Sequence, residues 1–177
     1  VHVAAGTLAL IVGTLVLVCA KGTTFHKTTG RYFVYLLVVV VSTGFLGWLF
    51  FRTNSFLLML TVLAGYNTFS GFRIVKLKRM KPRAVDGFAG VIALVCGLFY
   101  LAWLMRSEMI WTPTVIYPTL GSLVLVTVYD LAKQLWFHEK VRDCWLYEHI
   151  YKIISAFSAI LSAFVGTVLP AYKPYSQ

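Results

Sequence analysis

Six long apolar stretches, separated by short polar segments, make up most of this 177-residue chain. Each is close to the roughly 20 residues that a helix needs to cross a bilayer core. Lipid offers the backbone no hydrogen-bond partner, so we expect helices rather than strands. The pattern predicts an all-α integral membrane protein, in which residues 1–177 form one compact bundle of six transmembrane helices. The predicted spans are 3–20, 30–51, 56–72, 85–105, 115–135 and 149–169.

The basic residues between these stretches fall mainly on one side of the predicted membrane. With one crossing per stretch, 13 of the 16 Lys and Arg residues share a face, against Arg52, Arg106 and Lys173 on the other. Cytoplasmic loops retain Lys and Arg, which makes the basic face cytoplasmic. Six crossings then place both termini on the extracytoplasmic side. The 13 residues are Lys21, Lys27, Arg31, Arg73, Lys76, Lys78, Arg79, Lys81, Arg83, Lys133, Lys140, Arg142 and Lys152.

Composition agrees with a membrane protein and narrows the partners. Hydrophobic residues make up 59% of the chain and charged residues 12%, against roughly a quarter charged in soluble domains. The net charge of +10 is spread between the apolar stretches. We therefore expect anionic lipid head groups at the cytoplasmic face to be its partner, and not nucleic acid. Other membrane protein subunits are the second expected kind of partner.

Glycines recur at a spacing that suits close helix packing. Gly6 and Gly13 lie in the first stretch, and Gly90 and Gly97 in the fourth. Seven residues make about two helical turns, so the two members of each pair share one stripe. Small residues let membrane helices approach closely, and we expect these stripes to face other helices.

The four histidines bear on cofactor binding. His2 and His26 lie at opposite ends of the first helix and its loop, roughly 35 Å apart at 1.5 Å per residue. A transmembrane pair of bis-histidine haems is therefore excluded. A single haem or metal centre using two of His26, His138 and His149 stays open, against their role as solvated or capping residues.

Two aspartates at span ends call for partners. Asp86 opens the fourth helix, where a carboxylate suits the positive end of the helix dipole. Asp130 lies near the carboxyl end of the fifth helix, where the dipole disfavours an anion, so a positive partner is expected. The candidates for that partner are Arg73, Arg31 and His149. Glu148 and Lys152 are four residues apart and are expected to pair along the last helix.

The third stretch carries polar side chains, Tyr66, Asn67 and Ser70, with Arg73 one turn beyond. Polar residues within a span usually face the bundle interior or a water-filled cavity. They either join helices by hydrogen bonds or line a ligand cavity. The chain has none of the metalloprotease, nucleotide-binding or serine-hydrolase motifs, so an enzyme is not favoured.

The opening of the chain resembles a bacterial family of predicted multi-span membrane proteins, catalogued as a domain of unknown function. The matching positions are His2, Gly6, Gly13, Lys21, Gly22, His26, Gly30 and Arg31. Lys27 stands where that family usually has Arg. Further along, similar positions are Gly65, Tyr66, Arg73, Asp86, His149, Ala163 and Phe164. The resemblance implies a polytopic protein of the bacterial cytoplasmic (inner) membrane, and it implies no activity.

Three functions fit these observations. The first is a structural or accessory subunit of a membrane complex. The second is a cytoplasmic-side ligand site for a metal, haem or quinone, with His26 and His149 as principal contacts and as the metal ligands if a metal binds. The third is transport of a small solute. The residues of the candidate site are His26, His149, Arg31, Arg73, Asp86, Asp130, Tyr66 and Asn67.

Overall fold

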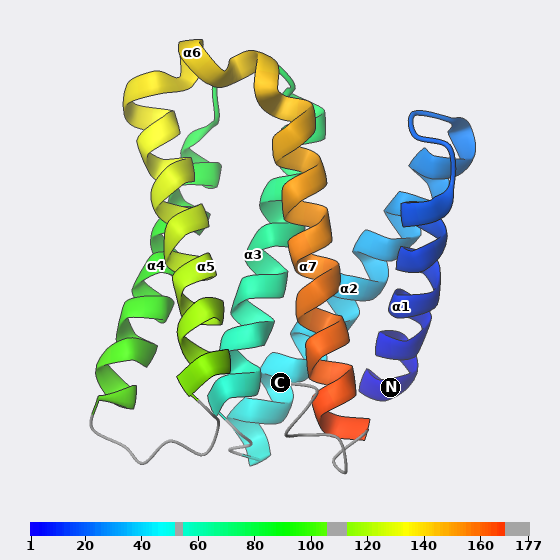
Figure 1. Ribbon diagram of the computed structural model, residues 1–177, viewed down its shortest axis with the longest axis vertical. Coiled ribbons are helices and arrows are strands. Elements are labelled where there is room, and N and C mark those ends of the chain that lie inside the picture. The colour runs from blue at the N-terminus through cyan, green and yellow to red at the C-terminus, as the bar shows by residue number, and fades with distance from the viewer. Residues whose placement is uncertain (52–54, 106–112, 169–177) are drawn as a thin grey trace.

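The computed structural model describes residues 1–51, 55–105 and 113–168, and these residues form helices without strands (Figure 1). Short turns join the last two long helices: η1 (Lys133–Phe137, a π-helical turn), α6 (His138–Val141) and η2 (Arg142–Cys144). The long helices are α1 (His2–Val18), α2 (Thr24–Phe51), α3 (Ser55–Leu77), α4 (Ala84–Leu104), α5 (Pro113–Ala132) and α7 (Trp145–Val168). The all-helical prediction is confirmed over the described residues.

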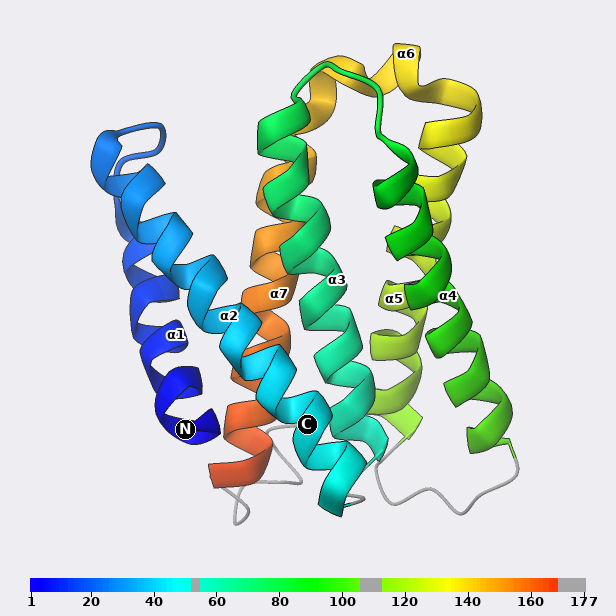
Figure 2. The same ribbon diagram turned by 180° about the vertical axis from the view of Figure 1, so that it is seen from behind.

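Three helical segments are long and apolar enough to cross a membrane: Thr24–Phe51, Ala84–Leu104 and Ile116–Thr167. The last of these runs through α5, the short turns and α7, whose axes lie in opposite directions (Figures 1 and 2). His2–Val18 is apolar but shorter. These segments identify a helical membrane protein.

Several helices extend past the predicted spans into polar sequence. Helix α2 begins at Thr24 instead of Gly30, because the Thr23 hydroxyl accepts a hydrogen bond from the His26 backbone N–H at 3.1 Å. Such side-chain caps satisfy backbone donors at a helix start. Helix α3 continues to Leu77, where Lys78 has a positive φ of 51° and ends it. The added turns carry charged residues beyond the apolar part of the bundle.

Helix α3 lies at the centre of the bundle and packs against α2, α4, α5 and α7, with its longest contact to α7. The α1–α2 hairpin covers one side of this α3–α7 pair, and α4 and α5 lie together on the other side (Figures 1 and 2). Buried residues occur on most sides of α3, among them Met59, Leu63, Ala64 and Asn67. A helix with neighbours on most sides is the natural place for a buried site.

The connections that carry most of the basic residues lie at one end of the bundle. The α1–α2 turn, the loop 78–83 and the η1–η2 segment all lie at the top of Figure 1. Contacts join two of them: Arg79 bonds Asp143 at 2.7 Å, and the His138 ring lies 3.1 Å from the Met80 carbonyl oxygen. Arg52, Arg106 and Lys173 lie outside the described residues.

The glycine stripes face neighbouring helices at three of the four predicted positions. A Cβ on Gly13 would lie 2.7 Å from the Phe157 ring and 2.8 Å from the Phe33 ring. A Cβ on Gly97 would lie 3.2 Å from Leu123, and one on Gly90 would lie 3.3 Å from Leu131 and the Tyr66 hydroxyl. Gly6 has nothing within 4 Å of such an atom. The close approach of α1 to α2 and α7 is therefore centred on Gly13.

This difference predicts opposite results for two alanine substitutions in α1. Gly13→Ala should lower the free energy of unfolding by about 1–3 kcal/mol, because the new methyl group forces two aromatic rings to move. Gly6→Ala should be neutral or stabilising by up to about 1 kcal/mol, because alanine favours the helix and meets no neighbour. Thermal unfolding of both variants in the same detergent measures the effect, and equal destabilisation would contradict this packing.

Candidate functional site

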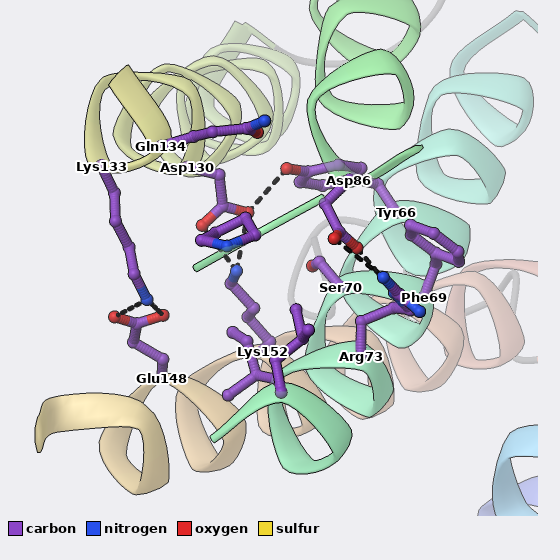
Figure 3. Close-up of a pocket in the computed structure, with 13 residues that line it drawn as sticks. Tyr66, Phe69, Ser70, Arg73, Asp86, Asp130, Lys133, Gln134, Glu148 and Lys152 are labelled. Atoms are coloured by element: carbon purple, nitrogen blue, oxygen red, sulfur yellow. Dashed lines mark hydrogen bonds and ion pairs between the residues drawn. The ribbon is translucent and has the colours of Figure 1, made fainter. Parts of the chain in front are cut away.

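A small cavity of about 40 Å³ lies among α3, α4, α5 and α7, at the end of the bundle where the basic connections gather. Figure 3 shows side chains of both charge signs pointing into it from all four helices. We call it the charged cavity. Its lining residues are Tyr66, Phe69, Ser70, Arg73, Ile74, Leu77, Pro82, Asp86, Asp130, Lys133, Gln134, Glu148 and Lys152.

Lys152 and Asp130 form the central ion pair of the charged cavity. The Lys152 ammonium, on α7, donates to both oxygens of Asp130, on α5, at 2.6 Å. The Tyr66 hydroxyl, on α3, donates to the same carboxylate at 2.6 Å. Three helices therefore meet at one carboxylate. The lysine is 1% exposed, so its charge is compensated almost entirely by protein groups.

A second ion pair, Lys133 with Glu148, lies beside the first (Figure 3). The Lys133 ammonium lies 2.6 Å from each Glu148 oxygen, and the Tyr129 hydroxyl donates to that carboxylate at 3.0 Å. Lys133 is the first residue of the π-helical turn η1. Such turns change the direction of the side chains around them and are frequent at functional sites.

Arg73 and Asp86 close the side of the charged cavity next to α4. The guanidinium donates two hydrogen bonds to the carboxylate, at 2.6 and 2.9 Å, in the bidentate geometry that arginine favours. The backbone N–H of Arg83 donates a third at 2.7 Å, so Asp86 caps the start of α4, where its carboxylate was expected to suit the helix dipole. Arg73 lies beyond the predicted span, and the hydrogen bond from its guanidinium to Asp86 raises the pKa of Arg73 above its ordinary value.

Two polar groups near the ion pairs have no protein partner among the described residues. Neither polar atom of the fully buried Asn67 side chain is hydrogen-bonded, and the buried Ser70 hydroxyl, which lines the charged cavity, is unpaired as well. A buried polar group without a partner costs about 1–3 kcal/mol. The charged cavity exceeds the roughly 10–15 Å³ that one water needs. Its shape and chemistry therefore suit water or a polar ligand group.

The structure brings together half of the predicted site. Tyr66, Arg73, Asp86 and Asp130 all line the charged cavity, and Asn67 lies buried one turn from Ser70 on α3. The predicted partner of Asp130 was wrong, because Lys152 occupies that place and Arg73 bonds Asp86. The predicted pairing of Glu148 with Lys152 along one helix was wrong too, since each bonds a residue of the facing segment.

The other predicted residues lie apart from the charged cavity. Arg31 is exposed on α2. The His149 ring lies 2.9 Å from the Gly71 carbonyl oxygen, which joins α7 to α3. The His26 ring lies 3.5 Å from the Cys19 sulfur and is near enough to His149 to interact with it electrostatically. The two imidazoles thus occupy neighbouring parts of the same end of the bundle.

Lys133, Glu148 and Lys152 belong to the site although they were not predicted as site residues. Lys133 and Lys152 were predicted to lie on the basic cytoplasmic face, where lysines are exposed, but both side chains are buried. One signal was available, because Asp130, Lys133, Glu148 and Lys152 all lie within or beside apolar helical sequence. Charged residues in such positions face the bundle interior and find partners there.

Among the described residues, no group of three or more His, Cys, Asp or Glu side chains could hold a metal ion.

Comparison with protein-family models, with curated proteins and with solved structures finds no match to the chain.

The central ion pair predicts a strongly non-additive pair of substitutions. Asp130→Asn or Lys152→Met alone should destabilise the protein by about 3–5 kcal/mol, because each leaves a buried charge without its partner. The double variant should recover most of that loss, since a buried pair of uncharged side chains needs no compensation. Unfolding of the four proteins in one detergent gives the coupling energy. Simple additivity would show that the two side chains do not form this pair.

Proposed function

We propose that this protein is a polytopic protein of the bacterial cytoplasmic membrane that binds a small ligand at the cytoplasmic end of its bundle. In this topology six helices cross the bilayer and both termini lie outside. The basic connections at one end of the structure support it, because they would all face the cytoplasm. The observation that carries the proposal is the charged cavity.

Structural packing alone does not account for the charged cavity. Lys133, Glu148 and Lys152 are at most 7% exposed, and burying such groups costs several kcal/mol per ion before any pairing. Well-packed apolar residues would stabilise the helices as well or better. Ionisable groups within membrane helices are rare and mark binding sites or relays. The unpaired Ser70 hydroxyl on the wall of the charged cavity gives a ligand a further polar contact.

The proposed topology predicts where single cysteines react. In a chain with its three native cysteines replaced by alanine, Val1→Cys should react with a membrane-impermeant maleimide in intact cells. Lys81→Cys, in the loop 78–83, should react only after the cells are permeabilised. Both positions are exposed, so accessibility reports the side of the membrane and not burial. The reverse pattern would overturn the orientation.

The proposed ligand site predicts what copurifies with the protein. After purification in a mild detergent, native mass spectrometry should show one small molecule per chain. The double variant Asp130→Asn, Lys152→Met should lose it while keeping most of the thermal stability of the protein. Its matched control is Arg79→Ala, Asp143→Ala, which removes an ion pair exposed at the surface outside the charged cavity. That control should retain the small molecule.

The same measurement separates the alternatives. A stoichiometric partner chain with no small molecule would replace this proposal by the accessory-subunit function. A ligand retained in both double variants would place the binding site elsewhere in the protein. Loss of the ligand in both would show that it responds to general changes at the cytoplasmic end, and would contradict a site in the charged cavity.

A further inference from the structure

A second, larger hollow lies next to the charged cavity, between α5 and α7. It has a volume of about 480 Å³, within the range of small-molecule sites. We call it the α5–α7 groove. Its lining residues are Leu125, Val126, Tyr129, Cys144, Tyr147, Glu148, Tyr151 and Lys152. Glu148 and Lys152 line both spaces, so these two side chains form the wall between them.

The α5–α7 groove is open on its outer side. Leu125 is 70% exposed and Tyr147 75% exposed, and both lie on helices of a segment long and apolar enough to cross a membrane. In the proposed topology the Leu125 side of this opening faces the lipid, and the Cys144 and Tyr147 side lies at the membrane surface. A ligand can therefore enter sideways from the membrane, with an apolar tail left among the lipid chains.

The walls of the α5–α7 groove favour a flat ring with polar atoms. Tyr129, Tyr147 and Tyr151 contribute three aromatic rings, and Leu125 and Val126 add an apolar surface. Aromatic rings stack on or edge against a flat partner with a gain beyond simple burial. The Tyr129 hydroxyl already donates to Glu148, and the Tyr147 and Tyr151 hydroxyls can donate hydrogen bonds to a ring that carries carbonyl oxygens.

The charge around the α5–α7 groove favours a neutral head group. Between residues 130 and 152 the chain has four acidic and four basic residues, although its net charge is +10. Within the wall of the groove, Glu148 is paired with Lys133 and Lys152 with Asp130. An anionic lipid head group would find no uncompensated cation there, whereas the exposed basic residues elsewhere at this end would attract it.

We propose that the α5–α7 groove binds a lipid-soluble quinone, with its ring among the three tyrosines and its tail leaving towards the lipid. Quinones combine a flat neutral ring, two carbonyl acceptors and an apolar tail, which matches the three properties of the groove. The inference rests on the proposed function, because the bound ring would contact Glu148 and Lys152, which also line the charged cavity. It concerns binding and assigns no electron transfer.

Cysteine protection tests this assignment. Cys144 lines the α5–α7 groove and is exposed, and Cys96 is exposed on α4. The protein is placed in phosphatidylcholine nanodiscs, and decylubiquinone, whose substituted ring does not add thiols, is titrated in. At ten times its Kd, alkylation of Cys144 should slow about tenfold, as expected for a site that is about nine-tenths occupied. Alkylation of Cys96 should not change.

A variant that fills the groove supplies the control. Leu125→Trp replaces an aliphatic side chain in the α5–α7 groove by an indole ring. The position is 70% exposed, so the fold has no need to rearrange. This variant should abolish the protection of Cys144 by decylubiquinone. The matched variant is Leu98→Trp, at a half-exposed position on α4 outside the groove, and it should leave the protection intact.

Each other outcome overturns the assignment in a recognisable way. Protection by phosphatidylglycerol and not by the quinone would identify an anionic lipid site. A disulfide between Cys144 residues of two chains would identify an interface between copies. If decylubiquinone gives no protection while the wild-type protein still copurifies with a molecule that depends on Lys152, the quinone assignment fails and the proposed function stands. If that copurified molecule is absent too, both fail.

Discussion

A lysine in the interior of a membrane bundle stays charged only if a carboxylate meets it there, and this requirement organises the centre of the protein. Lys152 reaches Asp130 across the space between α7 and α5, and the Tyr66 hydroxyl of α3 donates a further hydrogen bond to that carboxylate. The distances leave little freedom, because moving one helix by an ångström would break the pair. The three helices are therefore held in register by electrostatics at one end, while apolar packing holds them along the rest of their length.

The remainder of the site follows from this arrangement. Once α5 and α7 are joined at Asp130 and Lys152, the next turn brings Lys133 opposite Glu148. On the side of the charged cavity next to α4, Arg73 bonds Asp86 and holds the start of α4 against the same end. The loop 78–83 then covers this end and contacts the η1–η2 segment through Arg79 and Asp143. Ion pairs and loops thus close this end of the bundle, and its apolar body needs no such contacts.

Much of the fold could be predicted from the sequence, because apolar length and the placement of Lys and Arg are set by the solvent on each side. Helices occur over all six apolar stretches within the described residues, three helical segments are long and apolar enough to cross a membrane, and Asp86 caps α4. Side-chain pairing could not be predicted in the same way. Several cationic side chains were candidates for the partner of Asp130, and the rotation of α5 against α7 determines that Lys152 is the one in contact with it. Lys133 depends on a π-helical turn, for which hydrophobic periodicity gives no signal.

The π-helical turn at Lys133–Phe137 has a consequence for how the chain tolerates changes in length. Such a turn holds one residue more than an α-helical turn, and each residue of an α-helix rotates the chain by about 100°. Deletion of one residue from this turn would allow regular α-helix to continue from α5. Because the π-helical turn already holds the extra residue, everything that follows would then keep its orientation relative to Asp130, whereas a deletion within α5 would turn it by about 100°. The segment thus absorbs one residue between the two halves of the site, and it would accept a one-residue deletion more readily than the regular turns of α5 or α7 would.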